Sequence, residues 1–206
     1  MISAREALAR LREGNRRFVA CAAAEEPVLD AARRRALARS QEPFAVVLGC
    51  SDSRVPAELV FGQGFGDLFV IRVAGNIVAP SQVGSVEFAA TRFGTRLVVV
   101  LGHTACGAVT ATVEELRRPA PSQSPGLREI VERVRPAVEP LLAAARAEED
   151  ATLIARAVRA NVRAAVDELR HGSDVLRPLA DHEGLAVVGA EYDLRTGVVD
   201  FFYGDV

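Results

Sequence analysis

Two short apolar runs, each ending at a glycine and followed at once by side chains that can bind a metal, constrain this chain most. The first run is residues 44–49, before Cys50, and the second is residues 97–102, before His103 and Cys106. Short apolar runs that end at a glycine predict buried strands of a parallel sheet. Both reactive clusters would then follow the carboxyl ends of strands, where open α/β sheets bind their ligands.

Cys50, His103 and Cys106 are the residue types that zinc prefers as ligands. A structural zinc site takes four protein ligands, whereas a catalytic site takes three and keeps one position open. The sequence has no fourth Cys or His close to these three, so we expect one catalytic zinc ion per chain. From these residues alone, two alternatives stay open: a pair of buried thiols beside a core histidine, and cobalt or iron in place of zinc.

Asp52 and Arg54 follow Cys50 by two and four residues. An arginine can hold a carboxylate in a bidentate pair. The carboxylate can then accept a hydrogen bond from a reacting water, or it can coordinate the metal itself and close the site. A solvated surface pair of little energetic value is the alternative without function. Their position beside an expected ligand favours a catalytic role for both residues.

The overall composition excludes several classes of protein. The 206 residues carry a formal charge of -2, which gives no basic surface for nucleic acid. No apolar run reaches the roughly 18 residues that a membrane span needs. The N-terminus shows no apolar signal segment, so we expect a cytoplasmic location and no membrane partner. Three cysteines are too few for a disulfide framework.

Three further residues of potential chemistry are interpreted as structural. Cys21 has no His or Cys near it in sequence, which is typical of a small apolar filler. His171 and His182 fall at the ends of predicted helices, where we expect surface groups or helix caps rather than metal ligands.

Apolar periodicity and turn residues predict an α/β chain with helices and strands in alternation. Helices are expected at 3–20, 30–38, 56–61, 84–93, 107–117, 126–147, 151–170 and 174–182. Pro136 and Pro140 should break or kink the helix at 126–147. Strands are expected at 44–49, 68–73, 97–102, 185–192 and 198–203. The last two would form a hairpin and add an antiparallel edge to a mostly parallel sheet flanked by helices.

We expect a single domain over 1–206, with an N-terminal helical arm at 1–40, a zinc-site core at 41–117, and C-terminal helices and a hairpin at 126–206. The arm begins with a capping-box spacing at Ser3 and Glu6. Leu8, Leu11 and Phe18 fall on one face of it, interrupted by Asn15. This amphipathic arm is predicted to pack on another surface, such as that of a partner subunit.

The motif Cys-Ser-Asp-Ser-Arg at 50–54, followed by His-x-x-Cys-Gly at 103–107, resembles the β-class carbonic anhydrase family. The match extends to residues 67–72, to Gly75-Asn76 and to Glu87-Phe88. The resemblance implies reversible hydration of CO2 to bicarbonate and a proton by a zinc-bound hydroxide. It assigns zinc to Cys50, His103 and Cys106, and the orientation of the reacting water to Asp52 and Arg54. It also implies a homodimer or a higher even oligomer, with the active-site cleft at the subunit interface.

The same resemblance assigns substrate-lining positions to Gln41, Phe69 and Phe88. Phe88 is Tyr in many relatives, so any polar role at that position is lost here. Relatives that bicarbonate inhibits at a second pocket carry Trp where this chain has Val47, and this chain has no Trp. We therefore predict the open form, with water on zinc and Asp52 held by Arg54.

Three other functions remain alternatives at the sequence level. Some relatives hydrolyse carbon disulfide or carbonyl sulfide at a similar zinc site. A thiol redox sensor would join Cys50 and Cys106 in a disulfide. A structural zinc would require a fourth protein ligand. Asp52 and Arg54 have no evident purpose in the last two.

Overall fold

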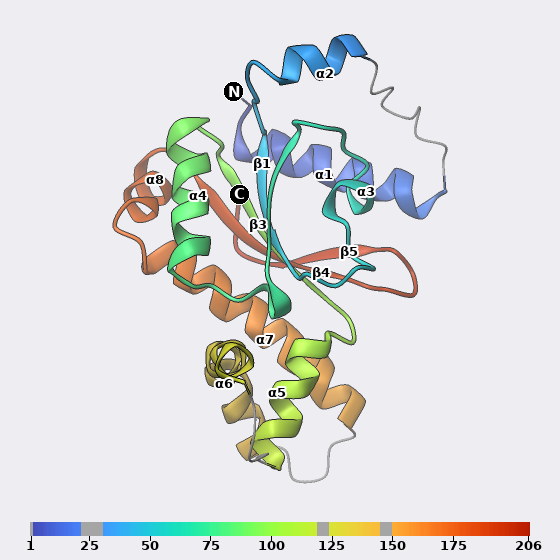
Figure 1. Ribbon diagram of the computed structural model, residues 1–206, viewed down its shortest axis with the longest axis vertical. Helices are drawn as coiled ribbons and strands as arrows, with labels where there is room; N and C mark the ends of the chain where they lie inside the picture. The colour runs from blue at the N-terminus through green and yellow to red at the C-terminus, as the bar shows by residue number, and fades with distance from the viewer. Residues whose placement is uncertain (1, 22–30, 119–123, 145–149) are drawn as a thin grey trace.

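A five-stranded sheet with helices on both faces organises the molecule (Figure 1). The computed structural model describes residues 2–21, 31–118, 124–144 and 150–206. The strands lie in the order β2-β1-β3-β4-β5, and β5 alone runs antiparallel to its neighbour. Their bounds are β1 Ala45–Gly49, β2 Leu68–Arg72, β3 Leu97–His103, β4 Ala186–Tyr192 and β5 Val199–Tyr203. The predicted mostly parallel sheet with an antiparallel edge is therefore confirmed.

The two apolar runs became the centre of this sheet. Every residue of β1 and of β3 is buried, because each strand has a neighbour on both sides and helices on both faces. Gly102 ends the apolar run for a packing reason. A Cβ atom at Gly102 would lie 2.6 Å from Cγ2 of Val162. Only glycine at this position therefore lets the helix that carries Val162 lie so close to the strand.

Helices cover the two faces of the sheet and extend beyond its carboxyl end (Figure 1). On one face α1 (Ala4–Val19) and α3 (Ala57–Val60) pack on the sheet. On the other lie α4 (Pro80–Arg92), α7 (Asp150–His171) and α8 (Leu176–His182). Beyond the carboxyl ends of the strands, α5 (Gly107–Arg117) and α6 (Pro125–Ala144) pack with α7 and the short helix η1 (Ala74–Asn76). Helix α2 (Ala31–Leu37) extends away from the sheet.

Helix α1 packs on the sheet of its own chain. Its predicted capping box is confirmed: Ser3 Oγ accepts from the Glu6 N–H, and Glu6 accepts from the Ser3 N–H. Leu11 is fully buried among residues of the sheet and α3. Asn15 does not interrupt this packing; it is buried and hydrogen-bonded. Packing of the arm on a partner subunit stays a prediction, and it would concern the partly exposed Phe18 and Val19.

Two sequence interpretations were wrong, namely the break of the helix at Pro136 and Pro140 and the apolar setting of Cys21; a kink at the two prolines stays a prediction. Helix α6 continues through Pro136 and Pro140. Both prolines lie four residues apart on the exposed face, so water can hydrate the carbonyl oxygens that lose an N–H partner. Cys21 is exposed rather than an apolar filler, because α1 has already ended and the chain turns there with φ 47°.

The remaining boundaries differ from prediction by a few residues. Helix α4 begins at Pro80 rather than at 84, since proline suits the first position of a helix. The hairpin of β4 and β5 is confirmed, and its turn is closed by Asp193 Oδ1, which accepts from the N–H groups of Arg195 and Thr196. His171 and His182 are exposed at helix ends, as predicted. Residue 30 of the helix predicted at 30–38 and residues 145–147 of the helix predicted at 126–147 lie outside the described residues.

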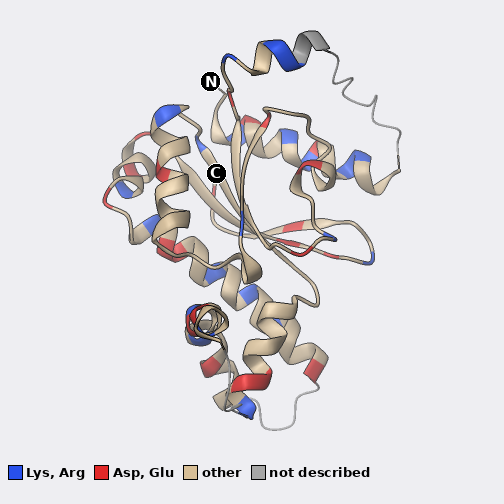
Figure 2. Ribbon diagram, in the orientation of Figure 1, with Lys and Arg blue, Asp and Glu red and all other residues tan. Residues whose placement is uncertain are grey.

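Charged residues of both signs are interspersed over the helices (Figure 2), as expected from the near balance of charge. Among the described helices, none combines the length and the apolar character needed to cross a membrane.

Candidate metal centre

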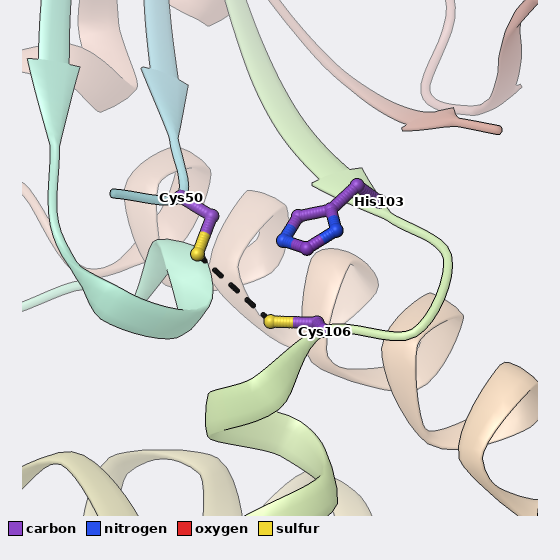
Figure 3. A group of neighbouring side chains, drawn as sticks. All are labelled: Cys50, His103 and Cys106. Atoms are coloured by element: carbon purple, nitrogen blue, oxygen red, sulfur yellow. Dashed lines mark hydrogen bonds between the residues drawn. The ribbon is translucent and has the colours of Figure 1, made fainter. Parts of the chain in front are cut away.

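Three side chains meet where β1 and β3 end. Cys50 follows β1, His103 is the last residue of β3, and Cys106 immediately precedes α5 (Figure 3). All three are buried, and their ligand atoms lie within 4.8 Å of one another. The sulfur atoms of Cys50 and Cys106 are 3.9 Å apart, and the His103 ring points toward them. The structure thus brings together the three residues that sequence reasoning assigned to a metal.

The hydrogen bonding of His103 suits a metal ligand. Nδ1 lies 3.0 Å from the main-chain oxygen of Thr104, and because that oxygen can only accept, Nδ1 carries the proton. The lone pair is then on Nε2, which is buried and has no hydrogen-bond partner among the described residues. An unpaired buried nitrogen is costly unless something binds it. Two sulfur donors and this free imidazole nitrogen fit a zinc ion.

The loop 103–106 is fixed by one left-handed residue and by hydrogen bonds to β4 and the turn that follows it. Ala105 has φ 54°, a left-handed conformation that alanine rarely adopts. The Thr104 N–H donates to Tyr192 O at 3.0 Å, and Thr104 Oγ1 accepts from the Leu194 N–H at 3.1 Å. These bonds and the left-handed residue bring Cys106 back toward His103 at the start of α5.

The pKa values of the two thiols move in opposite directions when no metal is present. The pKa of Cys50 falls because Cys106 donates a hydrogen bond to it, against the opposing effect of burial. The pKa of Cys106 rises because Cys50 takes up the negative charge, and burial adds to this. The N–H groups of Val109 and Ala108, in the first turn of α5, partly offset the rise. A divalent cation would remove this competition by stabilising both thiolates.

Asp52 lies at the edge of this cluster and is held by Arg54, as predicted. Arg54 Nε donates to Asp52 Oδ1 at 2.9 Å, and Arg54 Nη2 donates to Oδ2 at 2.6 Å. This pairing holds the pKa of Asp52 well below its usual range, although partial burial opposes the effect. Asp52 Oδ2 lies 3.8 Å from His103 Nε2, so a negative carboxylate stands beside the expected metal position.

Sequence reasoning missed three residues that hold the Cys50 loop. Arg72 Nε donates to Cys50 O at 3.0 Å, and Arg72 Nη2 donates to Asp52 O at 2.6 Å. The Gly75 N–H donates to Cys50 Sγ at 3.3 Å, and the buried Asn161 donates to Gly75 O at 2.8 Å. The family resemblance covered Arg72 and Gly75 without giving them a role, because their contacts depend on the pairing of β2 with β1 and on the packing of α7.

Gln41, Phe69 and Phe88 lie together, but not beside the three ligands. The rings of Phe69 and Phe88 pack on Phe93, with centroids 6.1 and 5.5 Å from it. Gln41 and Phe93 line the same surface recess of about 720 Å³. Phe69 pairs with Val46 on β1, four residues before Cys50, which is about 13 Å along a strand.

Comparisons with known proteins find relatives that cover most of this chain. A model of the family described as carbonic anhydrase matches residues 45–199. Carbonic anhydrase 2 of Mycobacterium tuberculosis is 45% identical over 130 residues, which span 62% of this chain but only 61% of that relative. A carbonic anhydrase of Pseudomonas aeruginosa is 37% identical over 176 residues, which cover 82% of this chain and 78% of the relative.

Two solved structures share the fold over nearly the whole chain. The β-carbonic anhydrase CafA of Aspergillus fumigatus superposes with a TM-score of 0.75 at 28% identity, covering 96% of this chain and 89% of that one. A Coccomyxa β-carbonic anhydrase, solved with acetazolamide, has a TM-score of 0.74 at 26% identity, covering 95% and 86%.

Proposed function

Because this chain belongs to the β-class carbonic anhydrase family, we propose that it catalyses the reversible hydration of CO2 to bicarbonate and a proton. The observation that carries this proposal is the buried cluster of Cys50, His103 and Cys106, with a free imidazole nitrogen and a carboxylate beside it. A zinc ion bound by these three residues would supply Lewis acidity and make water reactive near neutral pH.

Asp52 performs the orienting step. Its carboxylate stays ionised because Arg54 occupies both oxygens on one side, leaving lone pairs that accept a hydrogen bond from the attacking water. The bidentate contact with Arg54 fixes the position of the Asp52 carboxylate. The direction in which the carboxylate accepts a hydrogen bond is then fixed as well. Arg54 therefore acts through Asp52, and the ligand residues act by holding the metal.

Gln41, Phe69 and Phe88 serve as the substrate-lining residues of a site on a second copy of the chain. Within one chain, the register of β1 and β2 separates Phe69 from Cys50. Phe88 is 51% exposed beside the recess that Gln41 lines, so this aromatic surface is available to a partner. The proposed sharing of the site requires a homodimer or a higher even oligomer. The proposed location of the enzyme is the cytoplasm.

Subunit complementation tests this sharing. A Cys106→Ser chain and a Gln41→Ala chain, each weak alone, should recover activity when assembled together, because one of two mixed sites then carries neither change. Recovery no greater than the sum of the separate activities would place both residues in one chain's site.

The test of the proposed function is stopped-flow CO2 hydration with protein of known metal content, from about pH 6.5 to 9, where ionisation of a zinc site is expected. We expect one zinc per chain and a rate that rises with pH along one sigmoidal curve. Zinc-loaded protein that hydrates no CO2 at any pH would contradict the proposal and favour hydrolysis of carbon disulfide or carbonyl sulfide.

Asp52→Asn separates orientation from metal binding. The amide keeps the shape but loses the negative charge, so zinc should stay bound while turnover falls about 100-fold or more. Asp150→Asn removes a carboxylate from a surface pair with Arg117 and is the matched control, with turnover unchanged. Full turnover in Asp52→Asn would remove Asp52 from the mechanism.

A further inference from the structure

The main chain of the Cys50 loop is held by a side chain outside the expected catalytic set. Arg72 ends β2, and the register pairs it with Gly49, the residue before Cys50. From there its guanidinium group reaches two main-chain oxygens, that of Cys50 at 3.0 Å and that of Asp52 at 2.6 Å. One planar group thus spans the turn that leads from the expected ligand to the expected catalytic carboxylate.

Arg54 and Arg72 contact different parts of the same loop. Arg54 contacts the carboxylate of Asp52, whereas Arg72 contacts only carbonyl oxygens and forms no ion pair within the described ranges. Asp52 O also accepts from the Val55 N–H at 3.1 Å, so Arg72 completes the second acceptor site of the same oxygen. Hydrogen bonds from a charged donor are stronger than neutral ones, which suits a group that fixes an otherwise exposed turn.

We propose that Arg72 is a positioning residue, which fixes the main chain between Cys50 and Asp52 and thereby sets where the Asp52 carboxylate stands relative to His103. This inference rests on the proposed function. A turn held only at its ends would let the carboxylate move by an ångström, and such a displacement costs about 100-fold in rate. Lysine at this position supplies one point donor and cannot span both oxygens as a fork.

The experiment compares Arg72→Ala and Arg72→Lys with Arg96→Ala in zinc-loaded protein. Arg96 is the matched control because it also donates to a main-chain oxygen, that of Ala90, but at the amino end of β3. We expect Arg72→Ala to retain zinc while kcat falls between about 10- and 100-fold with little change in KM. Arg72→Lys should fall between that variant and the original protein, and Arg96→Ala should keep full kcat.

Two further readouts distinguish positioning from general loss of structure. Arg72 is exposed, so millimolar guanidinium chloride can enter the vacated space and should restore part of the kcat of Arg72→Ala, with sodium chloride at equal ionic strength as control. Hydrogen exchange should accelerate at the amides of Arg54 and Val55, which bond to Asp52, and stay unchanged in β3.

Equal kcat in Arg72→Ala and Arg96→Ala would overturn the inference. Faster exchange throughout the sheet, with no rescue by guanidinium, would also overturn it, because that result indicates a purely structural role. If the zinc-loaded original protein hydrates no CO2, the proposed function fails, and the exchange of residues 54 and 55 still decides whether Arg72 holds the turn.

Discussion

The two loops that carry the cysteines of the candidate metal centre are held in different ways. The loop after β3 is fixed by its own conformation and by the neighbouring strand: Ala105 is left-handed, and Thr104 bonds to the main chain of Tyr192 in β4 and of Leu194 just after it. The loop after β1 is fixed by side chains and main chain of other elements: Arg72 comes from β2, the Gly75 N–H from η1, and Asn161, which holds Gly75, from α7. Both loops depend on the assembled sheet, but the β3 loop adds a left-handed residue of its own, whereas the β1 loop relies on the side chains of Arg72 and Asn161.

Removing a sulfur from either loop should have the largest effect, and the effect should be the same for both loops. Cys106→Ser and Cys50→Ser are each expected to lose zinc and nearly all turnover, because a hydroxyl does not replace a thiolate as a zinc ligand. The exposed Cys21 provides the control, and Cys21→Ser should keep both. Metal analysis after gel filtration checks this. One zinc per chain in either loop variant would exclude that cysteine as a ligand.

The remote support of the β1 loop predicts the next effect. Asn161→Leu removes the donor to Gly75 O and should weaken zinc binding about tenfold, as expected for a residue behind the ligands. Asn15→Leu is the control, since Asn15 is also a buried asparagine that donates to main-chain oxygens, far from the metal. Both variants should lower the free energy of unfolding, by about 1–3 kcal/mol for each lost partner. Competition with a chelator measures zinc affinity, and equal affinities in the two variants would refute the role of Asn161.

Arg54→Met should produce a smaller change that depends on pH. Without Arg54, the pKa of Asp52 should return toward its ordinary value of about 3.9. Because the folded pKa lies below the unfolded one, the pair adds stability above about pH 4 and loses it as the pH falls through the folded pKa. The stability difference between the original protein and the variant should therefore be full at pH 7 and narrow below pH 4. Thermal unfolding across this range checks it, and a constant difference would contradict it.

Ala105→Gly should have the smallest effect and tests the local support of the β3 loop. Glycine relieves the left-handed conformation, but it also loosens the unfolded chain, so the free energy of unfolding should change by at most about 1 kcal/mol. Ala105→Val should be destabilising, because a branched side chain tolerates this conformation poorly. Calorimetry with zinc bound would reveal the difference. Equal stability of the glycine and valine variants would argue against strain at this residue.

The difference between local patterns and long-range contacts explains what the sequence could predict. The apolar runs of β1 and β3 and the short spacing of His103 and Cys106 are local, and they gave the sheet centre and the candidate ligands. Arg72 at a strand end and Asn161 within a helix resemble ordinary surface and core positions until β1 pairs with β2 and α7 packs on η1. Likewise Pro136 and Pro140 predicted a break that exposure to solvent makes unnecessary.

Asn15 gives the chain a constraint on the order of its assembly. The side chain of this residue donates to Gly197 O and accepts from the Val199 N–H, which are translated more than 180 residues after it. Its three partners, which include Val60 O, are complete only after residue 199 has left the ribosome. Helix α1 is thus secured late relative to its own synthesis, and a nascent chain stalled before residue 197 would hold α1 without two of these bonds.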